Sequence, residues 1–264
     1  MGSILGEIVE QTRVDLKKRK QQISRVDLET LSGYERERRS LADALTAKTP
    51  VSIIAEVKKA SPSEGVICQN FNPAEIARQY EKAGAAAISV LTDGPAFQGS
   101  LAHLQLASQK VDIPLLRKDF IVDPYQIKEA RAYGADAILL IALITDGAQL
   151  QELQHAAREE DLECLVECYT ERDLTLIDFK QTKILGVNNR NLRTFKVNVH
   201  RSIALLKKAP EGTVLVSESG INSSADINLL TKNKIDAALI GTYFMRRDEP
   251  GEALKNMINE MNKK

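Results

Sequence analysis

The sequence predicts an α/β fold, a (β/α)8 barrel (TIM barrel) with an extra N-terminal helical extension. From Val51 onward, short apolar segments alternate with amphipathic ones, a pattern typical of a parallel sheet covered by helices. A helix-to-strand junction also recurs, as A-G-A-A-A-I at 83–88, Y-G-A-D-A-I at 133–138 and N-K-I-D-A-A at 233–238. Because this repeat continues into the C-terminal part of the chain, we expect the sheet to close into a ring.

Residues 1–50 are predicted to form the N-terminal helical extension, packed on a barrel of residues 51–264 in a single domain overall. A helix is expected over residues 4–19, with Ser3 as a candidate N-cap. Its apolar face comprises Ile4, Leu5, Ile8, Val9, Thr12 and Leu16. We expect this face to dock on the barrel.

The barrel itself is predicted to contain eight strands. Four are apolar runs at 51–58, 113–118, 162–167 and 213–218, and the other four are the segments that begin at the recurring junctions and the run I-L-G-V at 184–187. Helices are expected near residues 73–83, 100–109, 123–133, 146–160, 170–180, 199–207, 223–232 and 250–262.

Several residues suit the ends of these helices. Pro73 and Pro124 fit first-turn positions, and Gly84 and Gly134 fit the position where a helix gives way to a strand. Candidate N-caps are Asp123, Thr170 and Asn222.

A doubly wound open sheet is the alternative fold. Such sheets often carry G-x-G-x-x-G after the first strand, and this chain has no such motif there. A length of 264 residues also suits one barrel domain. Closure of the sheet is therefore the favoured prediction.

Composition narrows the class of partner. The 36 basic and 36 acidic residues give no net charge, so we expect a small-molecule partner rather than nucleic acid or a membrane. The longest apolar run, 137–144, is too short to span a bilayer. Cys68, Cys164 and Cys168 form no CxxC pair, which favours reduced thiols and a cytoplasmic location. No metal is expected, and we expect a monomer or a weak homodimer.

Polar side chains end several of the predicted strands. Glu56 and Lys58 are two residues apart and share a face, and burying such ions is costly unless they pair with each other or with a ligand. Similar strand-end residues are Lys118, Glu167, Asn188, Arg190 and Glu218. Each one alone could be a structural ion pair. Because active sites of these barrels lie at the C-terminal ends of the strands, we expect all of them to converge.

A phosphate site is predicted at the last two strand ends. Ser219-Gly220 and Gly241-Thr242 follow the seventh and eighth strands, where phosphate sites of this fold are usual. Glycine lets the backbone approach an anion, and a short helix beginning near Thr242 would present free N–H groups. Ser61 could add a hydroxyl from the first loop.

Five segments carry a family resemblance. They are I-A-E-V-K-K-A-S-P-S (54–63), L-R-K-D-F-I-V-D-P-Y-Q-I (116–127), L-V-E-C (165–168), G-V-N-N-R-N-L-R-T-F (186–195) and V-S-E-S-G-I (216–221). The chain resembles indole-3-glycerol phosphate synthases over the whole barrel, and that family has an N-terminal extension like this one. L-R-K-D-F and V-N-N-R-N-L are very specific.

The resemblance implies one step of tryptophan biosynthesis, by a carbon-carbon lyase without a cofactor. In this step 1-(2-carboxyphenylamino)-1-deoxyribulose 5-phosphate, an anionic phosphate substrate, closes to indole-3-glycerol phosphate with loss of CO2 and water. By position, Lys118 resembles the general acid and Glu167 a proton-transfer residue. The other implied catalytic residues are Glu56, Lys58, Asn188 and Glu218. The implied substrate-binding residues are Arg190, Ser61, Phe120, Leu192, Ser219, Gly220, Gly241 and Thr242.

The chemistry suits these residue types. An aromatic carbon attacks a ketone, so a protonated lysine such as Lys118 can stabilise the developing alkoxide. The substrate carboxylate needs a cation, for which Arg190 or Lys58 is suited, and Asn188 can hold a hydroxyl. The dehydration step needs an acid and a base, and it stays open between Glu167 and the pair formed by Glu56 with Lys58.

Some positions depart from the family pattern. They are Tyr169 in place of His, Glu64 in place of a basic residue, Asn198 in place of Asp, and Thr242 at a variable position. Glu64 is expected to weaken the attraction of an anionic substrate. The loop 59–72 is long for its place, so we expect it to close over substrate with help from the N-terminal helix.

Two other functions stay open. One is a different phosphate-binding barrel enzyme, such as phosphoribosylanthranilate isomerase or a tryptophan synthase α-type lyase. An isomerase, however, would want a carboxylate acid/base pair rather than Lys118 beside Glu56 and Lys58. The other is a non-catalytic barrel module, which predicts a degenerate site, whereas every expected charged position is filled.

Overall fold

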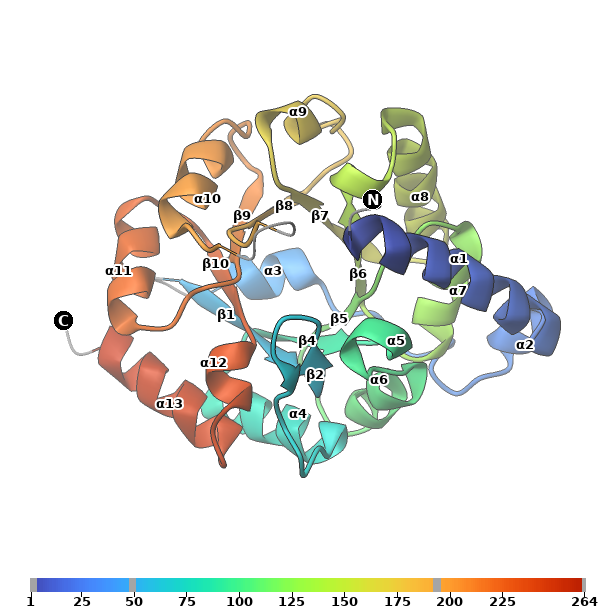
Figure 1. Ribbon diagram of the computed structural model, residues 1–264, viewed down its shortest axis with the longest axis horizontal. Coiled ribbons are helices and arrows are strands. Elements are labelled where there is room, and N and C mark those ends of the chain that lie inside the picture. The colour runs from blue at the N-terminus through green and yellow to red at the C-terminus, as the bar shows by residue number, and fades with distance from the viewer. Residues whose placement is uncertain (1–3, 48–50, 192–195, 263–264) are drawn as a thin grey trace.

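The computed structural model describes residues 4–47, 51–191 and 196–262, and in it parallel strands close into a barrel surrounded by helices (Figure 1). The barrel strands are β1 (Ser52–Val57), β4 (Ala87–Leu91), β5 (Leu115–Lys118), β6 (Ala137–Ile141), β7 (Glu163–Cys168), β8 (Ile184–Asn188), β9 (Val214–Glu218) and β10 (Ala237–Ile240). Their order is β1-β10-β9-β8-β7-β6-β5-β4, and β4 pairs with β1 to close the ring. The predicted (β/α)8 barrel is confirmed, and the open sheet is excluded.

Most of the predicted helices are present. Those on the outside of the barrel are α4 (Pro73–Ala83), α6 (Leu101–Ser108), α7 (Pro124–Ala132), α8 (Gly147–Glu159), α9 (Glu171–Leu174), α10 (Val199–Leu206), α11 (Ser224–Lys232) and α13 (Pro250–Met261). Short helices not expected from the sequence are α2 (Arg25–Glu29), α3 (Leu41–Thr46), α5 (Gly94–Phe97) and the 3-10 turn η1 (Ala142–Ile144). The short helix expected near Thr242 is α12 (Thr242–Met245).

Two details of the helix prediction are wrong. The helix expected over 170–180 ends at Leu174, because Asp178 builds a turn by accepting hydrogen bonds from Lys180 N and Gln181 Nε2. The N-cap of α11 is Ser223 rather than Asn222, whose backbone N–H donates to Asp226.

The other helix ends agree with the sequence. Asp123 and Thr170 cap their helices, and Pro73 and Pro124 lie in first turns. Gly84 and Gly134 follow α4 and α7 with φ of 97° and 87°. The strand predicted over 113–118 begins two residues later, since Pro114 has no N–H to donate to a neighbouring strand.

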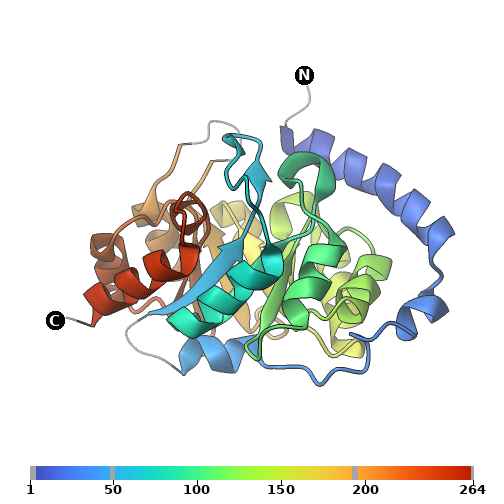
Figure 2. The same ribbon diagram turned by 90° about the horizontal axis from the view of Figure 1, so that it is seen from below.

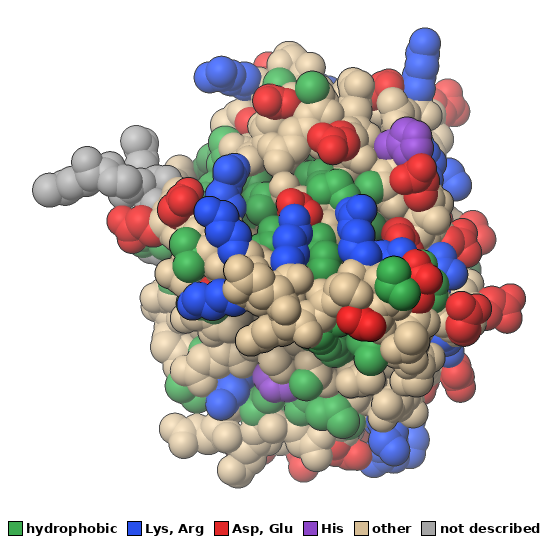
Figure 3. Space-filling model, turned by 90° about the vertical axis from the view of Figure 1, so that its right-hand side faces the viewer, with side chains coloured by type: hydrophobic (Ala, Val, Ile, Leu, Met, Phe, Trp, Pro, Cys, Tyr) green, Lys and Arg blue, Asp and Glu red, His purple; other side chains and the backbone are tan. Residues whose placement is uncertain are grey.

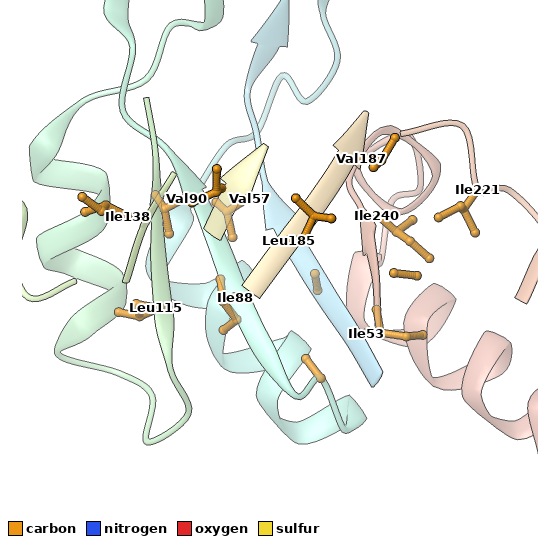
Figure 4. Close-up of a cluster of buried hydrophobic side chains, with 14 of the residues drawn as sticks. Ile53, Val57, Ile88, Val90, Leu115, Ile138, Leu185, Val187, Ile221 and Ile240 are labelled. Atoms are coloured by element: carbon orange, nitrogen blue, oxygen red, sulfur yellow. The ribbon is translucent and has the colours of Figure 1, made fainter. Parts of the chain in front are cut away.

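The apolar residues divide between two sides of the sheet because side chains alternate along a strand. One set, which includes Ile53, Val90 and Leu185, packs between the strands and the outer helices (Figure 4). The other set fills the inside of the barrel, and Leu41 and Leu45 of α3 pack against it. In Figure 2, α3 lies below the barrel, at the N-terminal ends of the strands. The opposite, C-terminal end is thereby left for polar side chains.

The N-terminal helix α1 (Ile4–Gln22) lies across the side of the barrel near α7 and reaches toward the C-terminal ends of the strands (Figures 1 and 2). Within its predicted apolar face, Thr12 and Leu16 are buried, whereas Ile4 is 44% exposed. Leu16 packs with Leu28 and Tyr125. The candidate N-cap Ser3 lies outside the described residues.

The long loop 59–72 contains a small hairpin that the sequence did not predict. It pairs β2 (Ala60–Ser61) with β3 (Gly65–Val66) in an antiparallel manner. Among the described residues, no helix is long and apolar enough to cross a membrane.

Candidate active site

A cavity of about 270 Å³ lies at the C-terminal ends of the barrel strands. Nearly all predicted site residues line it, namely Glu56, Lys58, Ser61, Lys118, Phe120, Glu167, Asn188, Arg190, Ser219, Gly220, Gly241 and Thr242. Glu218 does not line the cavity but lies directly beside it, bonded to Lys118. Leu192 lies outside the described residues. The residues come from six strand ends, and the barrel brings them together.

Lys118 occupies the end of β5 and points into the barrel between two carboxylates. Its Nζ lies 3.0 Å from Glu218 Oε2 and 3.7 Å from Glu167 Oε2. Burial alone would lower the pKa of Lys118, but the carboxylates of Glu218, Glu167 and Glu56 raise it well above its usual value. Lys118 therefore carries a proton that it can donate into the cavity.

Glu167, in β7, has an unusual protonation state. Burial is the main cause that raises the pKa of this carboxyl, and the Glu218 carboxylate raises it further, to about 8, against the opposing effect of Lys118 and a hydrogen bond from Asn188. That bond joins Asn188 Nδ2 to Glu167 Oε2 at 3.2 Å. A carboxyl that titrates near neutral pH can both take up and release a proton during a reaction.

Glu56 and Lys58, from β1 and the residue after its end, form a second pair. Glu56 Oε1 lies 2.7 Å from Lys58 Nζ, which also donates to Thr242 Oγ1 at 3.1 Å. Burial would raise the pKa of Glu56, but the attraction of Lys58, Lys118 and Arg190 outweighs it and lowers that pKa. Glu56 is thus an ionised carboxylate, in contrast to Glu167.

The loops after β9 and β10, where the phosphate site is predicted, both line the cavity. Ser219 and Gly220 have φ of 69° and 73°, so two successive residues adopt the left-handed conformation. A Cβ on Gly220 would overlap Val197, and a Cβ on Gly241 would overlap the Glu56 carboxylate. Both positions therefore require glycine, one for its φ and for space, the other for space alone.

The departures from the family pattern have identifiable surroundings. Glu64 forms an ion pair with Arg246 at 2.7 Å, so its charge at the cavity rim is compensated. The guanidinium of Arg201 lies over the ring of Tyr169, with Arg201 Cζ 3.4 Å from the ring centroid. Asn198 is the N-cap of α10 but makes no side-chain cap hydrogen bond.

Several cavity residues were not found by sequence reasoning. Ile4, Leu5 and Ile8 of α1 line the cavity, as does Phe97 of α5, whose ring lies 6.3 Å from that of Phe120. They form an apolar wall on one side of the charged residues. The helical periodicity of α1 identified its three residues as a docking face, and the N-terminal helix was expected to help close the site. No pattern in the sequence showed that these residues line the cavity themselves.

Gly186 in β8 is a further residue that the sequence did not mark as functional. A Cβ at this position would overlap Glu218 Oε1 and lie 3.2 Å from Leu165 Cδ1. Because Glu218 holds Lys118, glycine at 186 leaves the space that the ion pair needs.

We therefore expect Gly186→Ala to lower both stability and turnover. Overpacking of this kind costs about 1 to 3 kcal/mol, and displacement of Glu218 would move Lys118. Gly147→Ala is the control, since its added methyl would make ordinary contacts 3.6 Å from Leu176 O at the start of α8. Denaturant unfolding and kcat are measured on both variants. If Gly186→Ala unfolded at the same midpoint denaturant concentration as wild type, the close contact between residue 186 and Glu218 would be contradicted.

The family model for indole-3-glycerol phosphate synthase matches residues 5–257. The chain belongs to the indole-3-glycerol phosphate synthase family. The predicted family and activity, a lyase step in tryptophan biosynthesis, are thus confirmed, and the isomerase and the non-catalytic module are not supported.

Individual relatives agree with this family. An indole-3-glycerol phosphate synthase of Salinibacter ruber is 49% identical over 98% of this chain and 96% of its own length. One from Polynucleobacter asymbioticus is 51% identical over 78% of this chain and 77% of its own length. One from Acinetobacter baumannii is 43% identical over 98% of this chain and 96% of its own length.

Solved structures support the fold alone. A chain of the tryptophan synthase complex of Pyrococcus furiosus superimposes with a TM-score of 0.56 at 15% identity, over 80% of this chain and 97% of that one. 3-Hexulose-6-phosphate synthase of Salmonella typhimurium superimposes with a TM-score of 0.62 at 13% identity, over 80% of this chain and 100% of that one. At such identities the likeness shows a shared barrel and no shared substrate.

Proposed function

We propose that the cavity converts 1-(2-carboxyphenylamino)-1-deoxyribulose 5-phosphate to indole-3-glycerol phosphate, CO2 and water, as other members of the family are expected to do. The observation that supports this most strongly is Lys118, charged, buried and held by Glu218 and Glu167 at the cavity floor. Phe120 and the apolar wall line the same cavity as these charges, and such apolar surface suits an aromatic ring.

Lys118 acts first in the proposed reaction. The aromatic carbon that bears the carboxylate attacks the ketone carbon, and the ketone oxygen takes a proton from Lys118. Loss of CO2 then leaves its bonding electrons in the ring. The low polarity of a buried site strengthens the stabilisation that a cation gives to the developing alkoxide.

Glu167 is proposed to carry proton transfer in the dehydration step. A hydroxyl and a proton must leave as water, and a group with a pKa of about 8 can exchange protons at neutral pH. The second pair, Glu56 with Lys58, is proposed to serve as its counterpart on the opposite side of the cavity. Asn188 orients Glu167 through its hydrogen bond.

Substrate binding is proposed to use two sets of cavity residues. The carboxylate binds Arg190 or Lys58, which are cations that line the cavity. The phosphate binds the hydroxyls and backbone N–H groups of Ser61, Ser219, Gly220, Gly241 and Thr242. Leu192, also proposed to contact substrate, has no described position.

The proposed activity is tested by direct assay. Purified protein is incubated with the carboxyphenylamino-deoxyribulose phosphate, and product is followed by indole fluorescence without added metal or cofactor. An analogue that lacks the ring carboxylate is the control and should give no CO2. Absence of product from the complete substrate, with the protein folded, would contradict the proposal.

The phosphate loops are tested by a pair of ligands. We expect removal of the phosphate from the product to weaken its binding by at least about 100-fold, since several charge-assisted hydrogen bonds are lost. Calorimetry measures both dissociation constants. Equal affinity of the two ligands would show that these loops do not bind phosphate.

The other expectations stay predictions. They are the division at residues 50 and 51, closure of the loop 59–72, a monomer or weak homodimer, the absence of nucleic-acid and membrane partners, and a cytoplasmic location, which free thiols at Cys68, Cys164 and Cys168 favour. Among the described residues no group of His, Cys, Asp or Glu is arranged to hold a metal ion.

A further inference from the structure

A chain of buried charged residues lies on the outer side of β5, behind Lys118. Because side chains alternate along a strand, Lys118 points into the barrel while Arg117 and Asp119 point away from it. Arg117 is completely buried, and its Nη2 lies 2.8 Å from Asp119 Oδ2. It also donates to Thr92 Oγ1 and to the Gln126 carbonyl. The residues on either side of Lys118 are thus fixed.

Glu129 of α7 extends this network to the N-terminal helix. Its Oε2 lies 3.4 Å from Arg117 Nη2, and its Oε1 lies 3.0 Å from Arg19 Nε of α1. The Glu129 side chain is only 3% exposed. One buried carboxylate therefore joins the strand that carries Lys118 to the helix that precedes the barrel.

Both ends of this bridge reach the cavity. On the strand side, Asp119 Oδ1 accepts a hydrogen bond from Phe120 N at 2.8 Å, and Phe120 lines the cavity. On the helix side, Ile4, Leu5 and Ile8 in the first turns of α1 line the same cavity. The bridge thus connects residues of α1 and residues after β5 that line the same cavity.

Basic side chains are common on the side of the molecule where α1 lies (Figure 3). What distinguishes Arg19 is the burial of its partner. Lys20, the next residue, pairs with Asp123 at 2.7 Å, but there both side chains are substantially exposed. Exposed pairs contribute little, whereas an unpaired buried carboxylate is costly.

A buried ion network is weak evidence of stability, since well-packed apolar residues often serve as well or better. Its buried charges, which are costly to separate, can instead favour one geometry among several. Arg19 contributes to this as an ion pair, without a hydrogen bond from its Nε. We propose that Glu129 is a positioning residue. Through Arg19 and Arg117 it holds α1 at a fixed position relative to β5, so that the apolar wall stays over the bound substrate. This inference rests on the proposed function, because the group that the apolar wall would hold is the aromatic ring of the proposed substrate.

The test removes the helix end of the bridge alone. Arg19→Met keeps the apolar stem and leaves Glu129 paired with Arg117. We expect its KM, and its dissociation constant for indole-3-glycerol phosphate, to rise about fivefold to tenfold, which corresponds to about 1 to 1.4 kcal/mol. Its kcat should stay within about twofold of wild type, because the groups that transfer protons are untouched. Arg19→Lys should recover part of the loss.

Lys20→Met is the matched control on the same helix and should change KM by less than about twofold. A lower melting temperature of Arg19→Met with unchanged KM would overturn the proposal, because the bridge would then be merely structural. An equal rise of KM in Lys20→Met would overturn it as well, since any loosening of α1 would suffice.

Failure of the proposed function and failure of this inference give different results. If the proposed function is wrong, the wild-type protein shows no turnover; if only the inference is wrong, the wild-type protein turns over and the Arg19 variants behave like the control. Hydrogen exchange of residues 4–10 gives a readout that needs no substrate. Faster exchange in Arg19→Met than in Lys20→Met supports the proposal, and equal rates in the two variants overturn it.

Discussion

Lys118→Met is expected to lower kcat by about 10²- to 10⁴-fold, because the reaction loses its positioned proton donor. Loss of the charge beside the developing alkoxide adds to this effect. Methionine has a similar length, so the fold should survive. Glu218 and Glu167 then lie close together without their cation, and sharing a proton lets them avoid mutual repulsion. Ligand should still bind, since other groups hold the phosphate and the carboxylate.

The measurement compares kcat, the product dissociation constant and the melting temperature on one preparation. Lys110→Met, at an exposed position after α6, is the control and should match wild type in all three. Near-normal turnover in Lys118→Met would exclude its catalytic role. A melting temperature that collapses, with turnover lost only through unfolding, would show a structural role instead.

Glu167→Gln is expected to lower kcat by a comparable factor, about 10² to 10⁴, because glutamine cannot exchange a proton. The amide keeps the shape and the ability to bond Asn188 and Lys118. Product affinity should therefore change little. Asn188→Ala, which leaves the carboxyl in place, should have a smaller effect on kcat.

The same substitution should change how stability depends on pH. The pKa of Glu167 is about 8 in the folded state against a usual value of 4.5. Between these values the folded state binds more protons than the unfolded state, so stability is full below pH 4.5 and falls as the pH rises toward 8. The contribution to the slope is at most about 1.4 kcal/mol per pH unit.

Glu167→Gln should remove this decrease. Denaturant unfolding of both proteins at several pH values between 5 and 8 measures the difference. Parallel stability curves for wild type and variant would show that Glu167 has an ordinary pKa in the folded protein and carries no proton at neutral pH.

The sequence by itself determined the fold and the composition of the site. Alternation along each strand decides which side chains face inward, so Glu56 with Lys58, and Lys118 two residues after Leu116, could be assigned to the barrel interior. Local rules likewise placed the left-handed glycines Gly84 and Gly134. Such features depend only on residues that are close together in the sequence, so the sequence shows them directly.

Only the tertiary structure decided how these residues act on one another. Lys118 meets Glu218 across 100 positions of the chain. Burial and the Glu218 carboxylate raise the pKa of Glu167, and Lys118 opposes them. Gly186 matters only because Glu218 fills the space beside it. The bridge from Arg19 through Glu129 to Arg117 joins three elements whose packing no local pattern specifies. Distances, burial and electrostatic coupling are properties of the closed barrel, and they exist only after distant segments have packed together.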